Sequence, residues 1–230
     1  MTTQTGVYYK VLGADGSCYH GGKGRWPLAH DGQPGAWLPR LDGTLKPCSY
    51  GYHVLRPEHL IEWLGPAIHR AEAEEPVAWD ADKGVTRRAR DLGRILQWNR
   101  ETQLLFAADV IEHIAGLWVA PKGVTWKPAD TVDVIRRFTM GETAKDEIDA
   151  AAAAAYVTAR AADDDAAATI AYAAAVAAHT AATITARAAA TAAADAAIIA
   201  ATAARAADDA HSNERRWQTK RLCEYLEIDP

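Results

Sequence analysis

The sequence is poor in the residues that mark disulfide-rich and metal-binding proteins. Its 230 residues include three cysteines, two methionines and two phenylalanines. The cysteines, Cys18, Cys48 and Cys223, are odd in number, and their spacing matches neither a disulfide framework nor a zinc site. We therefore expect reduced thiols, no bound metal and a cytoplasmic protein.

Positive charge is also in short supply. The formal net charge is −5 and the isoelectric point is near 5.9, whereas binding to nucleic acid needs a basic stripe that releases counterions from phosphate. Because the net charge is negative, we expect no nucleic-acid partner. A secretory signal is not expected either, because the N-terminal stretch MTTQTGVYYKV has no basic start followed by a long apolar run.

The only long apolar stretch is an alanine-rich tract, in which more than half of residues 150–210 are alanine. Charged side chains recur within it, among them Arg160, Arg187, Asp195 and Arg205. Such charges would be costly at bilayer depth. We therefore expect a helical tract in water and no contact with a membrane.

Glycine and proline, which interrupt helices, are missing from the C-terminal part of the chain. No glycine follows Gly141, and the next proline after it is Pro230. Alanine is the best helix former because it loses no side-chain entropy. One straight helix over residues 146–210 would be about 95 Å long at 1.5 Å per residue. We therefore expect the tract to fold back on itself as a bundle.

Several short clusters predict where the helices of this tract begin, end or weaken. The aspartate run at 163–165 predicts an early break, since aspartate competes for nearby backbone N–H groups. The His-Ser-Asn stretch at 211–213 predicts a late break that caps the final helix ERRWQTKRLCEYLEI. Between them, the β-branched residues 183–185 weaken a helix without preventing it. Ahead of the tract, Thr143 is expected to cap the helix that follows.

The N-terminal part has a different composition. Seven of the eight tryptophans precede residue 130, and residues 6–80 contain short β-like runs, GVYYKVL, SCYHGG and YGYHVL, between turn signals. The segment RPEHLIEWLGPAIHRAEAE predicts a helix interrupted at its Gly-Pro step. The predicted fold class is α+β, with a small mixed α/β domain over residues 1–80 followed by an all-α, alanine-rich helical bundle over residues 92–230.

Two helices are expected at the start of the second domain, over RILQWNRETQLLFAADVIEHIAGLW and TVDVIRRFTMGE. On the first, Asp109, Glu112 and His113 lie at positions i, i+3 and i+4, a spacing that could present three ligands to one metal. We favour a polar face bonded to a neighbouring helix or to Arg100 and Arg136, because the sequence identifies no further metal ligand.

Threonine recurs every eleven residues along the alanine-rich tract. The positions are Thr158, Thr169, Thr180, Thr191 and Thr202. Eleven residues make three turns at about 3.67 residues per turn, so on one helix these side chains would form a straight stripe. We favour close packing of alanine and threonine faces. The alternative is an exposed ice-binding surface, because the interval resembles that of alanine-rich antifreeze helices.

Three stretches of the second domain carry a resemblance to a known family. LLFAADVIEH, RRFTMGE and ERRWQ, with the alanine tract before the last of them, occur in the order found in immunity-five-like, alanine-rich proteins of actinobacteria and actinophages. The likeness covers roughly residues 92–228. Ala108 and Val110 stand where the family has cysteines, so a thiol role is absent. The resemblance implies an immunity or toxin-neutralising role through binding to another protein.

The first domain carries a weaker resemblance. CYHGG at residues 18–22 and YGYHV at residues 50–54 look like strand motifs of ADP-ribosyltransferase folds. That likeness would give His20 the role of holding the nicotinamide ribose and Tyr52 the role of stacking on nicotinamide. No motif places the acidic residue that such enzymes need.

These observations favour a non-enzymatic protein that binds another protein and uses no cofactor. They leave its oligomeric state open. Two alternatives remain, an NAD-binding enzyme of the ADP-ribosyltransferase type in the first domain and an ice-binding protein that uses the threonines.

Overall fold

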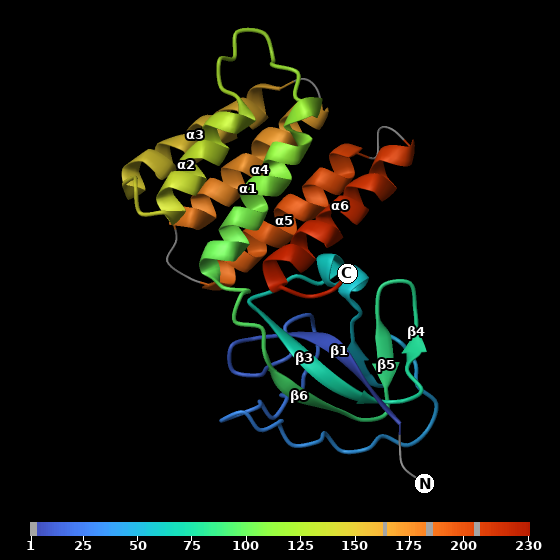
Figure 1. Cartoon of the computed structure of the whole chain (residues 1–230). Helices are drawn as coiled ribbons and strands as arrows, with labels where there is room; N and C mark the ends of the chain where they lie inside the picture. Colours follow the sequence, from blue (N-terminus) through green and yellow to red (C-terminus); the bar gives the residue numbers. More distant parts are fainter. Residues whose placement is uncertain (1–3, 163–164, 183–185, 205–207) are drawn as a thin grey trace. The chain divides into compact units, whose positions relative to one another are not determined.

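The structure of the chain is a computed structural model, which describes residues 4–162, 165–182, 186–204 and 208–230 (Figure 1). The chain divides into two compact units, Met1–Trp98 with Leu226–Pro230, and Asn99–Tyr225. The first unit contains two small antiparallel sheets and the second is helical. This arrangement confirms the α+β class.

Two three-stranded sheets build the first unit. One has the order β1-β3-β6, from β1 (Thr5–Leu12), β3 (Ala67–Glu74) and β6 (Ala89–Arg94). The other has the order β2-β5-β4, from β2 (Tyr52–Val54), β5 (Gly84–Thr86) and β4 (Ala78–Trp79). Buried apolar side chains form the core of this unit: Leu12, Trp26, Leu38, Val54, Ala71, Ala73, Val77 and Ala89.

The helix predicted over RPEHLIEWLGPAIHRAEAE is wrong. Its first part is a short 3₁₀ helix, Pro57–Glu62, and its second part is strand β3. The 3₁₀ helix ends at Glu62, before the Gly65-Pro66 step, and β3 then pairs along its whole length with β1. Cross-strand pairing thus overrides the local helical spacing. The run SCYHGG was expected to be a strand as well, and it forms only isolated bridges.

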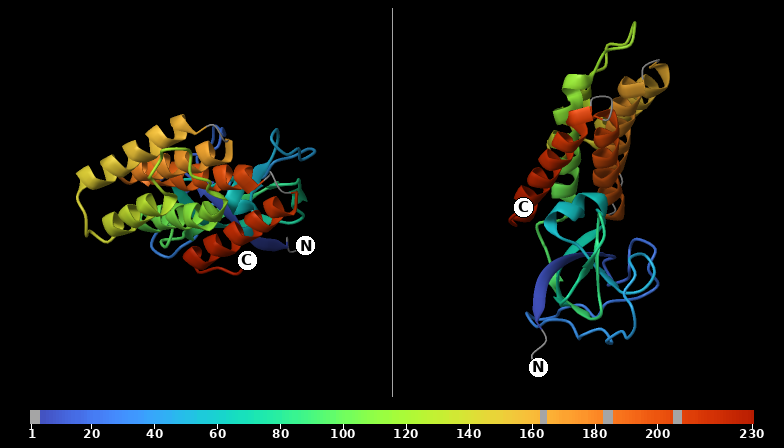
Figure 2. Two further views of the ribbon diagram at one scale, coloured as in Figure 1. Left: turned by 90° about the horizontal axis from the view of Figure 1, so that it is seen from above. Right: turned by 90° about the vertical axis from the view of Figure 1, so that its right-hand side faces the viewer.

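The second unit consists of helices that lie side by side, as Figure 2 shows in two further views. Their bounds are α1 (Arg100–Ile114), α2 (Pro128–Thr139), α3 (Lys145–Ala161), α4 (Asp165–Ala182), α5 (Ala186–Ala204) and α6 (Asp208–Leu226), with a 3₁₀ turn at Ala115–Leu117. α4 contacts α1, α2, α3 and α5, and α1 also contacts α2 and α5. None of the described helices is long and apolar enough to cross a membrane.

Alanine supplies much of the buried surface between these helices. Ala171, Ala174 and Ala178 on α4, and Ala193 and Ala197 on α5, are fully buried. Larger apolar side chains come mainly from the other helices: Leu104, Phe106, Ile111, Ile135, Ile148 and Leu222. Because methyl-sized side chains fill little space, helices bearing them can approach closely and still leave no cavity.

The predicted helix boundaries agree with the structure at one end of the tract and fail at the other. α3 ends at Ala161 and α4 begins at Asp165, so the early break falls at the aspartate run, of which residues 163–164 lie outside the described residues. The late break is wrong, because α5 ends at Ala204 and α6 already begins at Asp208. Two aspartates open α6, and acidic residues favour the first turn of a helix.

Two smaller expectations concern caps and weak points. The N-cap of α3 is Ala144 and not Thr143, whose hydroxyl donates to the carboxylate of Glu147 within the first turn. α2 ends at Thr139, and Gly141, two residues further on, has a φ of 74°, which suits the end of a helix. The β-branched cluster at 183–185 lies outside the described residues.

Candidate functional site

Asp109 connects three helices of the second unit. Its Oδ1, on α1, accepts a hydrogen bond from Arg136 of α2 at 2.8 Å. Its Oδ2 accepts from Arg221 at 2.8 Å and from the Tyr225 hydroxyl at 2.7 Å, both on α6. The residue is 8% exposed, so these contacts are largely shielded from water. One carboxylate therefore links α1 to α2 and to α6.

The hydrogen-bond donors around Asp109 stabilise its charged form. Burial alone would raise the pKa of this carboxyl, but hydrogen bonds from Tyr225, Arg136 and Arg221 outweigh burial and lower the pKa below its ordinary value. Burial, and then the bond to Asp109, raise the pKa of the Tyr225 hydroxyl. The carboxylate is thus a charged acceptor near neutral pH, and it holds no proton that it could donate.

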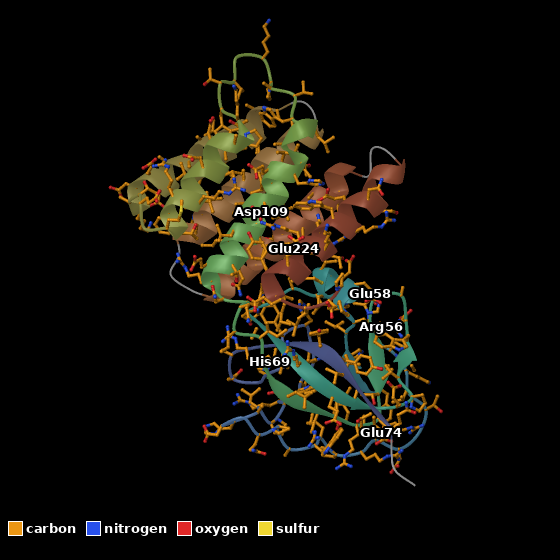
Figure 3. The ribbon with its side chains drawn as sticks, viewed as in Figure 1. Arg56, Glu58, His69, Glu74, Asp109 and Glu224 are labelled. Carbon is orange, nitrogen blue, oxygen red and sulfur yellow. The ribbon has the colours of Figure 1, made fainter. Side chains whose placement is uncertain are left out.

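Arg136 binds a second carboxylate on α1. Its two terminal nitrogens donate to the two oxygens of Glu112 at 3.0 and 2.6 Å, the forked geometry that makes arginine–carboxylate pairs strong. Hydrogen bonding from Arg136 lowers the pKa of Glu112. Asp109 and Glu224, both labelled in Figure 3, belong to a surface hollow of about 320 Å³. The hollow is lined by Asp109, Glu112, Arg136, Trp217, Lys220, Arg221 and Glu224.

His113 forms a second link between α1 and α6. Its ring stacks on that of Trp217, with 3.8 Å between centroids and 2° between planes. Its Nε2 lies 3.2 Å from a carboxylate oxygen of Glu214. The other oxygen of Glu214 accepts from Gln218 at 2.8 Å, and the Gln218 amide also donates to the carbonyl of Ala197 on α5 at 3.1 Å. The contacts of His113 thus continue through α6 to α5.

The structure gives each of the three polar residues predicted on α1 a partner on a neighbouring helix. Arg136 contacts two of them, whereas Arg100 donates to the carbonyl of Ala181 on α4 at 2.6 Å. Within the part of the chain that the structure describes, no group of three or more His, Cys, Asp or Glu side chains could hold a metal ion. These side chains form hydrogen bonds and ion pairs between helices.

The contacts of the polar α1 residues with α6 were not predicted from the sequence, although the spacing of the polar residues on α6 indicates a shared face. The residues of α6 on this face lie at spacings of three, four and seven residues: Glu214, Trp217, Gln218, Arg221 and Tyr225. The three stretches that carried the family resemblance thus meet in space, since LLFAADVIEH lies on α1, RRFTMGE ends α2 and ERRWQ lies on α6.

The threonines do not form one stripe. Thr158 lies on α3, Thr169 and Thr180 lie on α4, and Thr191 and Thr202 lie on α5. Thr158 is buried, Thr191 and Thr202 are exposed, and the side chain of Thr180 is outside those described. The helix breaks therefore divide the stripe that the eleven-residue interval would produce on a single helix. Thr202 donates to the carbonyl of Ile198 at 2.9 Å, a bond within its own helix.

Two exposed tyrosines shape the surface of α3 and α4. Tyr156 is 48% exposed and Tyr172 is 49% exposed. Both line two hollows of about 550 and 530 Å³, which we call the tyrosine hollows. The remaining lining residues of the two are mostly small: Asp149, Ala152, Ala153, Ala159, Arg160, Ala168, Thr169, Ala175, Val176, His179 and Thr202.

The structure separates the two residues proposed for nucleotide binding in the first unit. His20 lines a cavity, and its Nε2 lies 2.8 Å from the carbonyl oxygen of Trp63. Tyr52 is not among the described residues that line this cavity. Its hydroxyl donates to the carbonyl of Pro39 at 2.9 Å, and its ring packs edge-on against Trp26 in the core. Tyr52 therefore does not line the cavity that His20 lines.

The fold of the second unit is all-α, with a polar network that joins its first, second and last helices. Comparison with known families makes this specific: the family model of the Imm-5 like putative immunity proteins matches residues 94–225. Because the match covers more than half of the chain, the protein belongs to this family. Neither a curated protein nor a solved structure is significantly similar to the chain.

Proposed function

We propose that the protein neutralises a toxic protein by binding it through the helical unit, without catalysing a reaction. Membership of the immunity family carries this proposal, since the matched residues 94–225 include the whole helical unit, Asn99–Tyr225. The charged groups of the Asp109 network bind one another, and Asp109 holds no proton to transfer at neutral pH. Because these charged groups are already paired with one another, the network favours a protein-binding role over acid–base catalysis.

The tyrosine hollows are the contact surface that we assign to the toxic partner. Tyrosine is enriched at protein interfaces because its ring offers a large apolar area with few rotatable bonds and a polar end. Tyr156 and Tyr172 expose about half of their surface. Small side chains of alanine and threonine form part of the walls of these hollows and leave room for side chains of a partner.

The rest of the unit supports this surface as a rigid platform. α4, which carries Tyr172, contacts α1, α2, α3 and α5. α1 and α2 are in turn fixed to each other by Arg136. A surface that is ordered before binding loses less conformational entropy when the partner docks.

Affinity capture with matched surface variants tests this proposal. The tagged full-length chain is used as bait in a lysate of its native host, in parallel with a Tyr156→Ser/Tyr172→Ser double variant and a Tyr50→Ser control. Tyr50 is 39% exposed and lies in the first unit, so its variant removes a comparable ring elsewhere. A protein that binds through the tyrosine hollows should be enriched by the parent chain and the control, and lost with the double variant.

The captured protein is then expressed alone and together with this chain. Growth that stops when it is expressed alone and resumes on co-expression supports neutralisation. A captured protein without toxicity, or toxicity that this chain does not relieve, contradicts the function. Relief that is equally strong with the double variant contradicts only the choice of surface.

A further inference from the structure

The first unit contains a cavity that the immunity function does not use. It has a volume of about 270 Å³ and lies among β1, β2 and the loops beside them. The residues that line it are Lys10, Val11, Cys18, Tyr19, His20, Gly21, Gly22, Cys48, His53, Leu55, Trp63 and Lys83. Two lysines and two histidines are among them, and none of the described lining residues is acidic.

Lys10 is the unusual member of this set. It lies on β1, and its amine is 5.5 Å from the centre of the Trp26 ring in the core. Burial lowers the pKa of this amine, and among the described residues the side chain that opposes the shift is that of Cys18 and not a carboxylate. A buried ammonium without a carboxylate partner is costly, and an anion placed beside it would remove that cost.

A second lysine reaches the same cavity. Lys83 is 8% exposed, donates to Asp82 at 2.9 Å, and lies 4.6 Å from the centre of the Trp63 ring. The effects of both lysines meet at His53: burial lowers its pKa most, the charges of Lys10 and Lys83 lower it further, and the charge of Asp82 opposes them in part. The positive potential of two lysines is therefore focused on one small space.

The two histidines present ring nitrogens to this space. The backbone N–H of Cys48 donates to Nε2 of His53 at 3.0 Å, so in the neutral ring the proton lies on Nδ1. His20 places its Nε2 near the carbonyl oxygens of Trp63 and Leu64, at 2.8 and 3.2 Å. One ring nitrogen of each histidine is thus held by the backbone.

We infer that this cavity binds a small organic anion, a carboxylate or a phosphate monoester, with its charged group held by Lys10 and Lys83. The volume limits the ligand, because sites for drug-sized molecules measure about 300–1,000 Å³ and this one is smaller. A dinucleotide such as NAD is too large for it. The inference concerns the first unit alone and does not depend on neutralisation of a toxin.

The two cysteines in the cavity provide the test. Iodoacetate is a small carboxylate that alkylates thiols, and iodoacetamide is its uncharged analogue of nearly the same size. A cavity that concentrates anions should raise the rate at which iodoacetate alkylates Cys18 and Cys48 relative to the rate with iodoacetamide. The ratio of the two rates cancels differences in thiol reactivity and exposure. Mass spectrometry of peptides from the native full-length chain measures the ratio at each cysteine, and the denatured chain provides the reference.

We expect the ratio at Cys18 or Cys48 to exceed that of the denatured chain by about tenfold, since opposite charges attract strongly at a partly desolvated site. Lys10→Met should return it to the reference value. Lys46→Met, a substitution of the same kind at an exposed residue outside the cavity lining, should leave it unchanged. An ordinary ratio in the parent chain, or a raised ratio that survives Lys10→Met, overturns the inference.

A competition experiment needs no variant and therefore does not depend on folding of Lys10→Met. Inorganic phosphate and propionate are added to the parent chain, with neutral propionamide as the control. If only propionate slows labelling by iodoacetate, the cavity is a carboxylate site. If only phosphate slows it, the cavity is a phosphate site. Slowing by both identifies a general anion site. If neither anion slows the labelling more than propionamide does, the cavity is not an anion site.

Discussion

The imidazole of His113 lies parallel to the indole of Trp217, with ring centroids 3.8 Å apart and planes inclined by 2°. The two residues belong to α1 and α6, and they are more than a hundred positions apart in the chain. Beside this stack, Asp109 binds Arg221 and Tyr225 of the same last helix. The polar face of α1 therefore provides the contacts that hold the last helix against the first.

A double-mutant cycle measures how strongly the stack contributes. His113→Ala, Trp217→Ala and the double variant are unfolded in urea, and their free energies of unfolding are compared. Stacked aromatic pairs contribute about 0.5–1.5 kcal/mol beyond the area that they bury, so we expect a coupling energy in this range. Additive single effects would mean that the rings touch without stabilising each other.

Asp109→Asn should destabilise the helical unit clearly. The substitution keeps the size of the side chain but removes the charge that Arg136 and Arg221 share. Hydrogen bonds to charged groups contribute about 1.5–3 kcal/mol, and the arginines are partly exposed, so we expect a loss of about 1–3 kcal/mol in urea unfolding. The control is Asp133→Asn, which breaks an exposed pair with Arg137 on α2 and should cost less than about 0.5 kcal/mol. Equal losses would contradict the structural role of Asp109.

The same carboxylate predicts a pH dependence. The pKa of Asp109 is lower in the folded chain than in the unfolded chain, so the unfolded state takes up the proton first as the pH falls. The stabilisation is complete above the pKa of an unperturbed aspartate, about 3.9, and is lost as the pH falls through the lower folded-state value. Thermal unfolding between pH 6 and the acid range should therefore show a shallower loss of stability in Asp109→Asn than in the parent chain. Parallel curves would show that the folded-state pKa of Asp109 is not lowered.

Ala174→Leu tests whether the alanine faces are packed closely. Ala174 is fully buried on α4, and inserting larger side chains into a filled core costs about 1–3 kcal/mol. Ala154→Leu places the same side chain at an exposed position on α3, where we expect almost no change. Urea unfolding distinguishes the two, and an unchanged midpoint for Ala174→Leu would show that the helices can separate to admit a leucine.

The threonines should confer no antifreeze activity. Ice binding of this kind needs a flat row of exposed side chains, whereas Thr158 is 4% exposed and the five positions are divided among α3, α4 and α5. We expect no thermal hysteresis when the purified protein is cooled in the presence of an ice crystal. A hysteresis gap that disappears in Thr191→Lys would show that threonines of this tract bind ice.

The sequence predicts the helices of the second unit well because their determinants are local. Beyond Gly141, alanine content and the lack of glycine and proline favour helix, and the aspartate run at 163–165 coincides with a helix boundary. Even here the last break was misplaced, since Ser212 and Asn213 lie inside α6 and the helix starts at Asp208. Capping residues indicate where a helix can begin, and packing decides which of them is used.

Features that depend on distant partners could not be predicted in the same way. β3 has a sequence compatible with a helix, and it is a strand because β1, some sixty positions earlier, pairs with it. Likewise, spacing placed Asp109 on a polar face but could not show that Arg221 and Tyr225 complete its contacts. The cavity of the first unit was also missed, because Lys10 and Lys83 come together only through the fold.

Hydrogen–deuterium exchange of the complex with the captured toxic protein tests the central claim most directly. Backbone amides of α3 and α4 around Tyr156 and Tyr172 should exchange more slowly in the complex than in the free chain, with little change in residues 4–98. Protection confined to residues 4–98, or no protection of the helical unit, would contradict an immunity function that acts through the helices.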